Sequence, residues 1–465
     1  MALRFLPLSD AAMSGSPARR LRVQLFRGAR RVTRGRPFAW LRDLRRLRRL
    51  RPLAVLGFLG PGLIAASAGD DAGGIATFST VGAQYGYELL WMVVLVTISL
   101  AVVQEMCARM GAATGKGLSD LIRERFGVRG AAFAMLTLLV ANTLITVSEF
   151  VGIAAASELF GIPKYITVPV AALAVWFLVT RGSYSRVEKV FLAMTLAFFS
   201  YPVAAVLAHP NWGQVFHAAV VPTFHWQSAF LILFVGTVGT TISPYMQIYI
   251  QSAVAEKGIT MERYGPERAE TYAGTVFGTL ISAFILIACG ATIFVASGGK
   301  GTVITTADQA ARALAPFLGS FAPYLFGVGL LGASLLAAAV LPLSTAYSIC
   351  ESFGFERGVS RSFKEAPVFL GLFTGMIALG ALIALIPGLP LIQLLVATQV
   401  ANGVLLPILL VFILRLVNDR RVMGRHVNGP VKNVIAWGTT GILSMLCAVM
   451  IAAIILPAFG IPFLQ

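Results

Sequence analysis

The sequence predicts an all-α polytopic membrane protein with about eleven transmembrane helices. Three observations carry this prediction: 57% of the 465 residues are hydrophobic, only 12% are charged, and the mean hydropathy is +0.81. A soluble domain carries about 25% charged residues, so we expect this chain to bury its apolar surface in lipid and between helices. Hydropathy places the spans near residues 53–82, 84–108, 130–159, 165–180, 187–208, 228–254, 272–297, 323–350, 367–387, 390–414 and 433–457.

The first 51 residues are an Arg-rich segment, separate from a transmembrane domain that we expect to cover residues 52–465. Fifteen of the 37 Lys and Arg residues lie between Arg4 and Arg51, against two acidic residues, so the rest of the chain carries only +4 of the net charge of +17. This concentration argues against nucleic-acid binding. Leucines three apart among arginines from Leu41 to Leu50 favour an amphipathic helix on the cytoplasmic leaflet. A solvated basic tail, or a start codon upstream of the real one, fits equally well.

The basic residues of the transmembrane domain gather in every second loop. Loops 109–129, 181–189, 257–268, 357–364 and 415–432 are basic, whereas the intervening loops hold only Lys164, Lys300 and Arg312. The positive-inside rule then places the N-terminus in the cytoplasm and the C-terminus outside, consistent with an odd number of spans. We therefore expect a multi-pass protein of the cell (inner) membrane whose surroundings are the lipid bilayer. The sequence leaves its oligomeric state open, and a monomer satisfies these observations.

The first span is interrupted at A-S-A-G-D-D-A-G-G-I-A-T, residues 66–77, where Asp70 and Asp71 stand in an apolar run. A carboxylate within a bilayer is costly, which makes it a functional-site hypothesis. The apolar run stops at Ala68 and resumes at Ile75, and three glycines in six residues weaken the helix between them. Non-helical backbone at membrane depth is tolerated only where it lines a cavity or is buried in protein. Freed carbonyls beside a carboxylate predict a cation site.

A second break is expected five spans later, in F-V-G-T-V-G-T-T-I-S-P-Y-M-Q-I-Y-I-Q-S, residues 234–252. Gly236, Gly239 and Pro244 interrupt this span. The spacing of five spans favours two five-helix repeats of inverted topology. Interrupted segments in corresponding places of two repeats point to a transporter site near the midplane. Two unrelated kinks are the alternative explanation.

Three motifs carry a family resemblance. They are G-P-G-L-I-A-A-S-A-G-D-D-A-G-G-I-A-T (60–77), A-R-M-G-A-A-T-G-K-G-L-S-D-L-I-R-E-R-F-G (108–127) and A-T-Q-V-A-N-G-V-L-L-P (397–407). Together they resemble the natural resistance-associated macrophage protein (Nramp) family of divalent-metal transporters, over roughly residues 52–457. The resemblance implies the LeuT-type fold with broken helices 1 and 6, and a transporter rather than an enzyme.

The resemblance also implies where the metal ligands lie, and here the chain departs from the family. The family's metal-binding Asp falls on Asp71, its Asn falls on Gly74, and its Met falls on Ser243. A residue inserted before Gln251 would instead place Met246 at the site. We favour Ser243, because G-T-T-I-S-P aligns with the family motif without a gap.

These departures favour a hard cation. A thioether suits soft or borderline metals, whereas carboxylate, carbonyl and water suit Mg²⁺, Ca²⁺ and Mn²⁺. Mg²⁺ usually keeps several waters and binds one or two carboxylates. We therefore expect a secondary transporter that imports Mg²⁺ as a partly hydrated ion, similar to the magnesium-transporting branch of the family, with no cofactor. The expected metal site comprises the Asp71 carboxylate, Asp70 as a second charge, the Ala68 and Thr240 carbonyls, the Ser243 and Gln399 side chains, and Gly74, which widens the site. An outer-vestibule acid, or a protonated one, is the alternative for Asp70.

Proton coupling is the second departure. The family's proton path uses a His that is Tyr245 here and an acidic pair of which only Glu149 remains, with Thr146 at the Asp position. A proton relay through a membrane needs a chain of titratable groups, so we expect transport without proton coupling. Glu149 serves equally well as a hydrogen-bonded group between helices. The alternative function is a proton-coupled Mn²⁺/Fe²⁺ transporter of the ordinary family type, which would use Met246.

Overall fold

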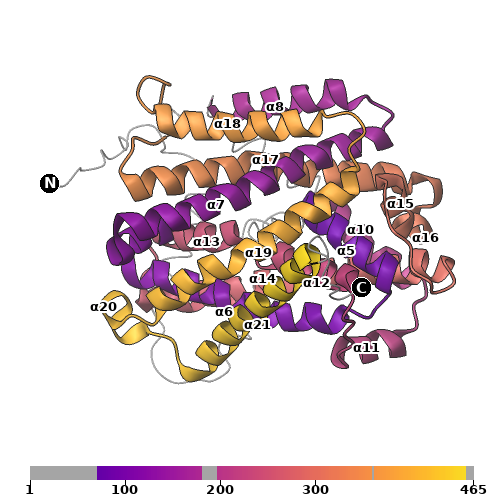
Figure 1. The fold of residues 1–465 in the computed structure, drawn as a ribbon, viewed down its shortest axis with the longest axis horizontal. Coiled ribbons are helices and arrows are strands. Elements are labelled where there is room, and N and C mark those ends of the chain that lie inside the picture. Colours follow the sequence, from indigo (N-terminus) through magenta and orange to yellow (C-terminus); the bar gives the residue numbers. More distant parts are fainter. Residues whose placement is uncertain (1–70, 181–195, 359–360, 457–465) are drawn as a thin grey trace, which may run out of the picture. The chain divides into compact units, whose positions relative to one another are not determined.

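The computed structural model describes residues 71–180, 196–358 and 361–456, and every regular element in these ranges is helical (Figure 1). The Arg-rich segment 1–51 lies outside the described residues, as do Ala68 and Asp70. The elements are α5 (Ala72–Tyr85), α6 (Leu90–Thr114), α7 (Leu118–Leu159), α8 (Lys164–Thr180), η2 (Leu196–Phe199), α10 (Ser200–Leu207), α11 (Trp212–Val220), α12 (Ser228–Thr241), α13 (Pro244–Glu256), η3 (Met261–Arg263), α14 (Tyr264–Cys289), η4 (Gly290–Phe294), α15 (Ala307–Ala311), η5 (Arg312–Leu314), α16 (Ala315–Leu318), η6 (Gly319–Phe321), α17 (Ala322–Phe353), α18 (Pro367–Ala384), α19 (Leu391–Val417), α20 (Arg420–Met423), η7 (Gly424–His426) and α21 (Pro430–Ile455).

The prediction of an all-α membrane fold is confirmed. Within the described residues, eight helical segments are long and apolar enough to cross a membrane, and α8 is a shorter apolar helix. The predicted spans 53–82 and 187–208 are described only in part, through α5 and through η2 with α10. The chain therefore presents its apolar helices in the order that hydropathy predicts.

The predicted loop 109–129 is wrong, because most of it is helical. Helix α6 continues to Thr114 and α7 begins at Leu118, with non-helical backbone inside α7 at Gly127, where φ is +68°. Arg109 lies within α6 and is only 7% exposed, since its guanidinium contacts the buried Glu105 carboxylate at 3.3 Å. Hydropathy ends a span at such a charge, whereas the fold buries the charge with its partner.

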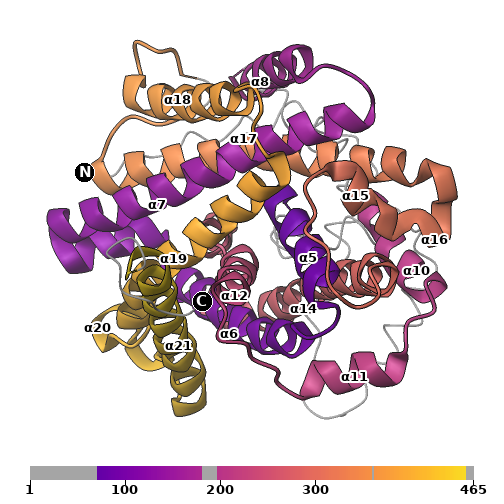
Figure 2. The same cartoon turned by 45° about the vertical axis from the view of Figure 1, so that its right-hand side comes forward.

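The 42-residue helix α7 is the scaffold of the described fold. It packs most extensively against α17 and then against α19 and α18. Figures 1 and 2 show α7, α17 and α18 side by side, with α8 beside α18. The short helix α5 packs against α14, α19, α12 and α7. The N-terminal end of α5, which carries Asp71, is thus buried between other helices.

Glycines let these helices approach closely, as small residues do in membrane proteins. A Cβ on Gly152 of α7 would lie 2.4 Å from the Ala72 Cβ of α5. A Cβ on Gly239 of α12 would lie 2.3 Å from the Gln399 carbonyl oxygen of α19. The prediction that Gly236 and Gly239 interrupt their span is therefore wrong. Helix α12 runs through both glycines, and the break between α12 and α13 lies at Ile242 and Ser243.

We expect Gly239→Ala to destabilise the protein by an amount on the order of 1–3 kcal/mol, because the new methyl group would overlap the α19 backbone. Thermal unfolding of the purified protein in detergent measures this change. Gly438→Ala in α21 is the matched control, since a Cβ there meets nothing within 4 Å and alanine favours the helix. Equal melting temperatures for the two variants would contradict the packing argument.

Candidate functional site

Asp71 sits at the N-cap of α5, inside the predicted break. Its backbone is extended (φ −68°, ψ 170°), and its Oδ1 accepts a hydrogen bond from the Gly74 N–H at 2.6 Å. The helix therefore begins at Ala72 rather than at Ile75, because the Asp71 carboxylate satisfies a free N–H of the first turn. Asp71 is only 4% exposed. Gly74 contributes this N–H and no side chain.

Gln399 of α19 approaches the same carboxylate from the opposite helix. Its Nε2 lies 3.3 Å from both Asp71 oxygens, and the residue is fully buried. Gly73 makes this approach possible, since a Cβ there would lie 2.0 Å from the Gln399 Nε2. The Gln399 Oε1 has no hydrogen-bond partner among the described residues. Because a half-turn of the amide exchanges Nε2 for Oε1, Gln399 can offer Asp71 a donor or a cation an acceptor.

The break between α12 and α13 supplies the second wall of the site. Ser243 is the N-cap of α13 and Pro244 occupies its first turn. Because proline has no N–H, the Thr240 carbonyl lacks the donor that a continued helix would provide. The Thr240 hydroxyl is also buried, with no partner in the described part of the chain. Thr240 thus presents oxygen atoms without helix donors, as the sequence analysis expects at a broken span.

Asn402 ties this break to α19, and the sequence analysis does not identify it. Its Nδ2 donates to the Gly239 carbonyl at 2.7 Å and to the Ser243 Oγ at 3.3 Å. Asn402 follows Gln399 by three residues, so both amides lie on one face of α19. The signal was present as two amides at helical spacing in an apolar span. By bonding to Ser243, Asn402 places Ser243 next to the face of α19 that carries Gln399.

Glu149 of α7 meets the same end of α5. It is completely buried, and its Oε2 accepts from the Ala72 N–H at 3.4 Å. Two carboxylates, Asp71 and Glu149, therefore share the first turn of one helix, whose free N–H groups favour negative charge. The structure brings Glu149 into the site, next to the expected metal-binding carboxylate.

Thr146 and Tyr245, the two other candidates for coupling, occupy different surroundings. The Thr146 hydroxyl donates at 2.7 Å to the Asn142 carbonyl of its own helix. Tyr245 belongs to a buried apolar cluster with Ile145, Met246, Ala337 and Leu341. The alternative ligand Met246 is part of this apolar cluster, whereas Ser243 is hydrogen-bonded to Asn402.

The interior of the site is rich in oxygen acceptors. Several buried oxygens have no hydrogen-bond partner among the described residues, and an unmatched buried polar atom costs about 1–3 kcal/mol. Gln247 and Gln251 follow Ser243 at four-residue intervals on one face of α13, and the Gln251 Nε2 donates to the Lys116 carbonyl at 3.1 Å, by the turn between α6 and α7. The unmatched side-chain oxygens on the helices that form the site include Ser148 Oγ, Glu149 Oε1, Thr240 Oγ1, Gln247 Oε1, Ser334 Oγ, Gln399 Oε1 and Asn402 Oδ1. A cation, or the water around one, is the partner that acceptors of this kind take.

The oxygen set differs from a resident metal centre. In the ranges that the structure describes, no group of three or more His, Cys, Asp and Glu side chains is placed to hold a metal ion. The site has two carboxylates, side-chain amides and broken-helix backbone instead.

Comparisons with known proteins give one family for most of the chain. Residues 62–453 match the family model described as Nramp: Natural resistance-associated macrophage protein-like. The divalent metal cation transporter MntH of Deinococcus radiodurans is 30% identical over 395 residues, which cover 82% of this chain and 86% of that protein.

Solved structures show the same fold. The manganese transporter of Eremococcus coleocola, solved in complex with an aromatic bis-isothiourea substituted compound, gives a TM-score of 0.68 at 20% identity, over 91% of this chain and 90% of that one. MhsT in complex with L-phenylalanine gives a TM-score of 0.56 at 15% identity, over 86% and 98% of the two chains. At these identities the likeness shows the LeuT-type fold alone.

Proposed function

This chain belongs to the natural resistance-associated macrophage protein-like family, and we propose that it carries divalent metal cations across the membrane through the site at Asp71. One observation supports the proposal above the others. Asp71 lies buried where α5 begins, and α19 joins it through Gln399 and Asn402 to the break between α12 and α13. The Thr240 and Gln399 side chains hold oxygen atoms without a partner among the described residues. Broken helices in corresponding positions form the ion sites of transporters with inverted repeats.

The relatives favour the manganese-type alternative over Mg²⁺ as the carried ion. One relative is named a divalent metal cation transporter and one structural neighbour a manganese transporter. Carboxylate, carbonyl and water ligands suit Mn²⁺ as well as Mg²⁺, so the oxygen atoms around Asp71 are compatible with this candidate. Mn²⁺ is therefore the first ion to test as the substrate.

Mg²⁺ is the second candidate, and the local chemistry favours it. Gly74 offers no side-chain ligand, and Ser243 offers a hydroxyl where a thioether would select softer ions. Mg²⁺ is bound through its own waters by few carboxylates, and the unmatched amide oxygens of Gln399 and Asn402 are acceptors for those waters. Asp70 and the Ala68 carbonyl complete this proposal from outside the described residues.

We propose further that transport proceeds without proton coupling. Of the three candidates for coupling, Glu149 is the carboxylate, and the Thr146 hydroxyl bonds within its own helix. A negative interior potential contributes about 2.3 kcal/mol per charge per 100 mV, and twice that for a dication. This driving force suffices for import into a cell without a proton gradient.

We expect liposomes containing the protein to take up Mn²⁺ and Mg²⁺, and Asp71→Asn to slow both at least about tenfold, because the substitution removes the charge that binds the ion. Trapped ion-sensitive dyes measure the influx. Asp308→Asn is the matched control, an exposed carboxylate that pairs with Arg312 at 3.3 Å. Uptake of Mn²⁺ without Mg²⁺ would discard the magnesium candidate, and uptake of neither by folded protein would discard transport.

We expect Ser243→Met to make Mn²⁺ uptake about tenfold more sensitive to Cd²⁺, because a thioether at the site binds the softer ion. The measurement is competition by Cd²⁺ in the same liposomes. Met246→Leu is the companion variant, and it should leave Cd²⁺ sensitivity at the wild-type level. If Met246→Leu lowers Cd²⁺ sensitivity instead, Met246 is the ligand and the gapped alignment is right.

We expect the lumen to keep its pH while metal enters, because no proton accompanies the ion. A trapped pH dye records this under a potassium diffusion potential, with Asp71→Asn liposomes as the leak control. Glu149→Gln should still show voltage-driven uptake. Acidification that rises with metal influx would establish coupling, and its loss in Glu149→Gln would assign the proton to Glu149.

A further inference from the structure

A polar cavity lies away from Asp71, where α7 begins, α19 ends and α21 begins. Its volume is about 580 Å³. We call it the basic cavity, and its polar lining residues are Arg125, Arg415, Asn418, Asp419, Asn433 and Trp437. Phe126 and Leu414 complete its walls. The proposed transport uses none of these residues.

Two asparagines that line the basic cavity, Asn418 and Asn433, are joined by a pair of reciprocal hydrogen bonds, and we call this pair the floor of the cavity. The Asn418 Nδ2 donates to the Asn433 Oδ1 at 2.9 Å, and the Asn433 Nδ2 donates to the Asn418 Oδ1 at 2.8 Å. The other amide hydrogen of Asn418 is donated to the Leu414 carbonyl, and the Asn428 Nδ2 also donates to the Asn433 Oδ1. The Asn433 Oδ1 thus accepts two hydrogen bonds and the Asn418 Oδ1 accepts one, while Asn433 keeps one amide hydrogen.

The other unmatched groups of the basic cavity are donors as well. The Arg415 guanidinium is exposed and forms no ion pair or hydrogen bond with a described residue. The same holds for the Trp437 indole N–H, on a side chain that is 44% exposed. Arg125 is paired with Asp419, which also accepts from the Arg421 N–H at 2.8 Å. The Asp419 charge is thus committed to its neighbours, and Arg415 leaves the cavity positive.

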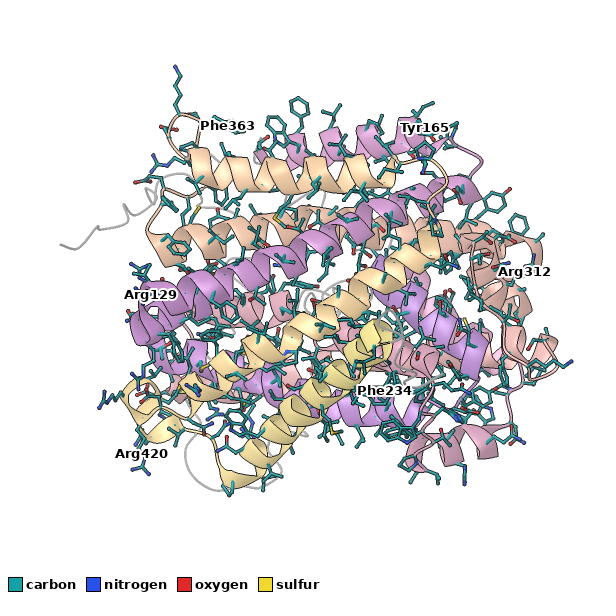
Figure 3. All side chains as sticks on the ribbon, in the orientation of Figure 1. Arg129, Tyr165, Phe234, Arg312, Phe363 and Arg420 are labelled. Atoms are coloured by element: carbon teal, nitrogen blue, oxygen red, sulfur yellow. The ribbon has the colours of Figure 1, made fainter. Side chains whose placement is uncertain are left out.

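The basic cavity lies where the apolar surface of the spans meets a basic end of the protein. Val434 of α21 is 74% exposed and Phe133 of α7 is 53% exposed, as expected for side chains that face lipid. Arg129 and Arg420 are exposed, and Figure 3 shows both at the same end of the helices as α20. Trp437 of α21 is partly exposed, and tryptophan is the residue type that gathers at membrane–water interfaces.

We propose that the basic cavity binds the phosphate-bearing headgroup of an anionic phospholipid, with Arg415, Trp437 and Asn433 as its hydrogen-bond donors. A guanidinium binds phosphate oxygens in a bidentate manner. Basic pockets between membrane helices on the cytoplasmic side are known sites for anionic headgroups. The acyl chains would continue along the apolar faces of α7 and α21.

The test is native mass spectrometry of the full chain in mild detergent, titrated with phosphatidylglycerol, with phosphatidylethanolamine or with inorganic phosphate. We expect one phosphatidylglycerol to bind in preference to the other two, and Arg415→Gln to weaken that binding about fivefold. Trp437→Phe keeps the ring and removes only the N–H, so it should weaken binding by a smaller factor. Each variant is first shown to be monodisperse.

Arg420→Gln is the matched control, because Arg420 has the same charge, lies nearby and does not line the cavity. It should bind phosphatidylglycerol as the wild type does. Equal weakening by Arg420→Gln would show diffuse attraction to a basic surface and overturn the proposal. Equal binding of phosphatidylethanolamine, or displacement of the lipid by inorganic phosphate at equal concentration, would overturn it too. Metal uptake is measured separately, so failure of this site and failure of transport are distinguishable.

Discussion

Keeping one carboxylate buried at the start of a helix is the constraint on which the rest of this structure depends. Asp71 has left water, so its oxygens require donors from the protein or a cation. The Gly74 N–H and the Gln399 amide provide those donors. Because the two come from different helices, α5 and α19 must approach closely, and Gly73 permits this. The close packing of α5 against α19 therefore follows from the need of the buried Asp71 carboxylate for hydrogen-bond donors.

The sequence predicts that two spans are broken and that Asp71 is central, because a carboxylate, glycines and a proline are rare in an apolar run. The predicted interruption at Pro244 agrees with the structure, whereas Gly236 and Gly239 lie within α12 and α5 begins at Ala72 rather than at Ile75. Glycine weakens a helix and also lets two helices touch, and the sequence alone does not separate the two effects. At Gly239 the contact with α19 decides the matter, and α12 continues. At Pro244 the missing N–H decides, and the helix ends before it.

The sequence does not show which hydrogen-bond or ion-pair partner each buried polar side chain has. From the sequence, Arg109 is assigned to a loop, whereas the structure pairs it with Glu105 inside α6. Asn402 is not singled out in the sequence, whereas the structure shows its hydrogen bond to the Gly239 carbonyl of α12. The same limit applies to Gln247 and Gln251, whose spacing is visible but whose unmatched oxygens are not. Residue type indicates what a side chain is able to bind, and only packing shows which of those bonds the fold has already made.

The unmatched polar groups of this protein divide by sign, and the division bears on what each region binds. Around Asp71 the unmatched atoms are carbonyl and carboxylate oxygens, which only accept, and hydroxyls, which both donate and accept, and an interior rich in such oxygens attracts a cation. In the basic cavity the unmatched groups are donors, and a set of donors attracts an anion. A membrane protein meets both partners, since dissolved cations reach it from the water on either side and phosphates line the surfaces of the bilayer. The polarity of what the fold leaves unpaired therefore distinguishes a pathway for a cation from a contact with lipid headgroups.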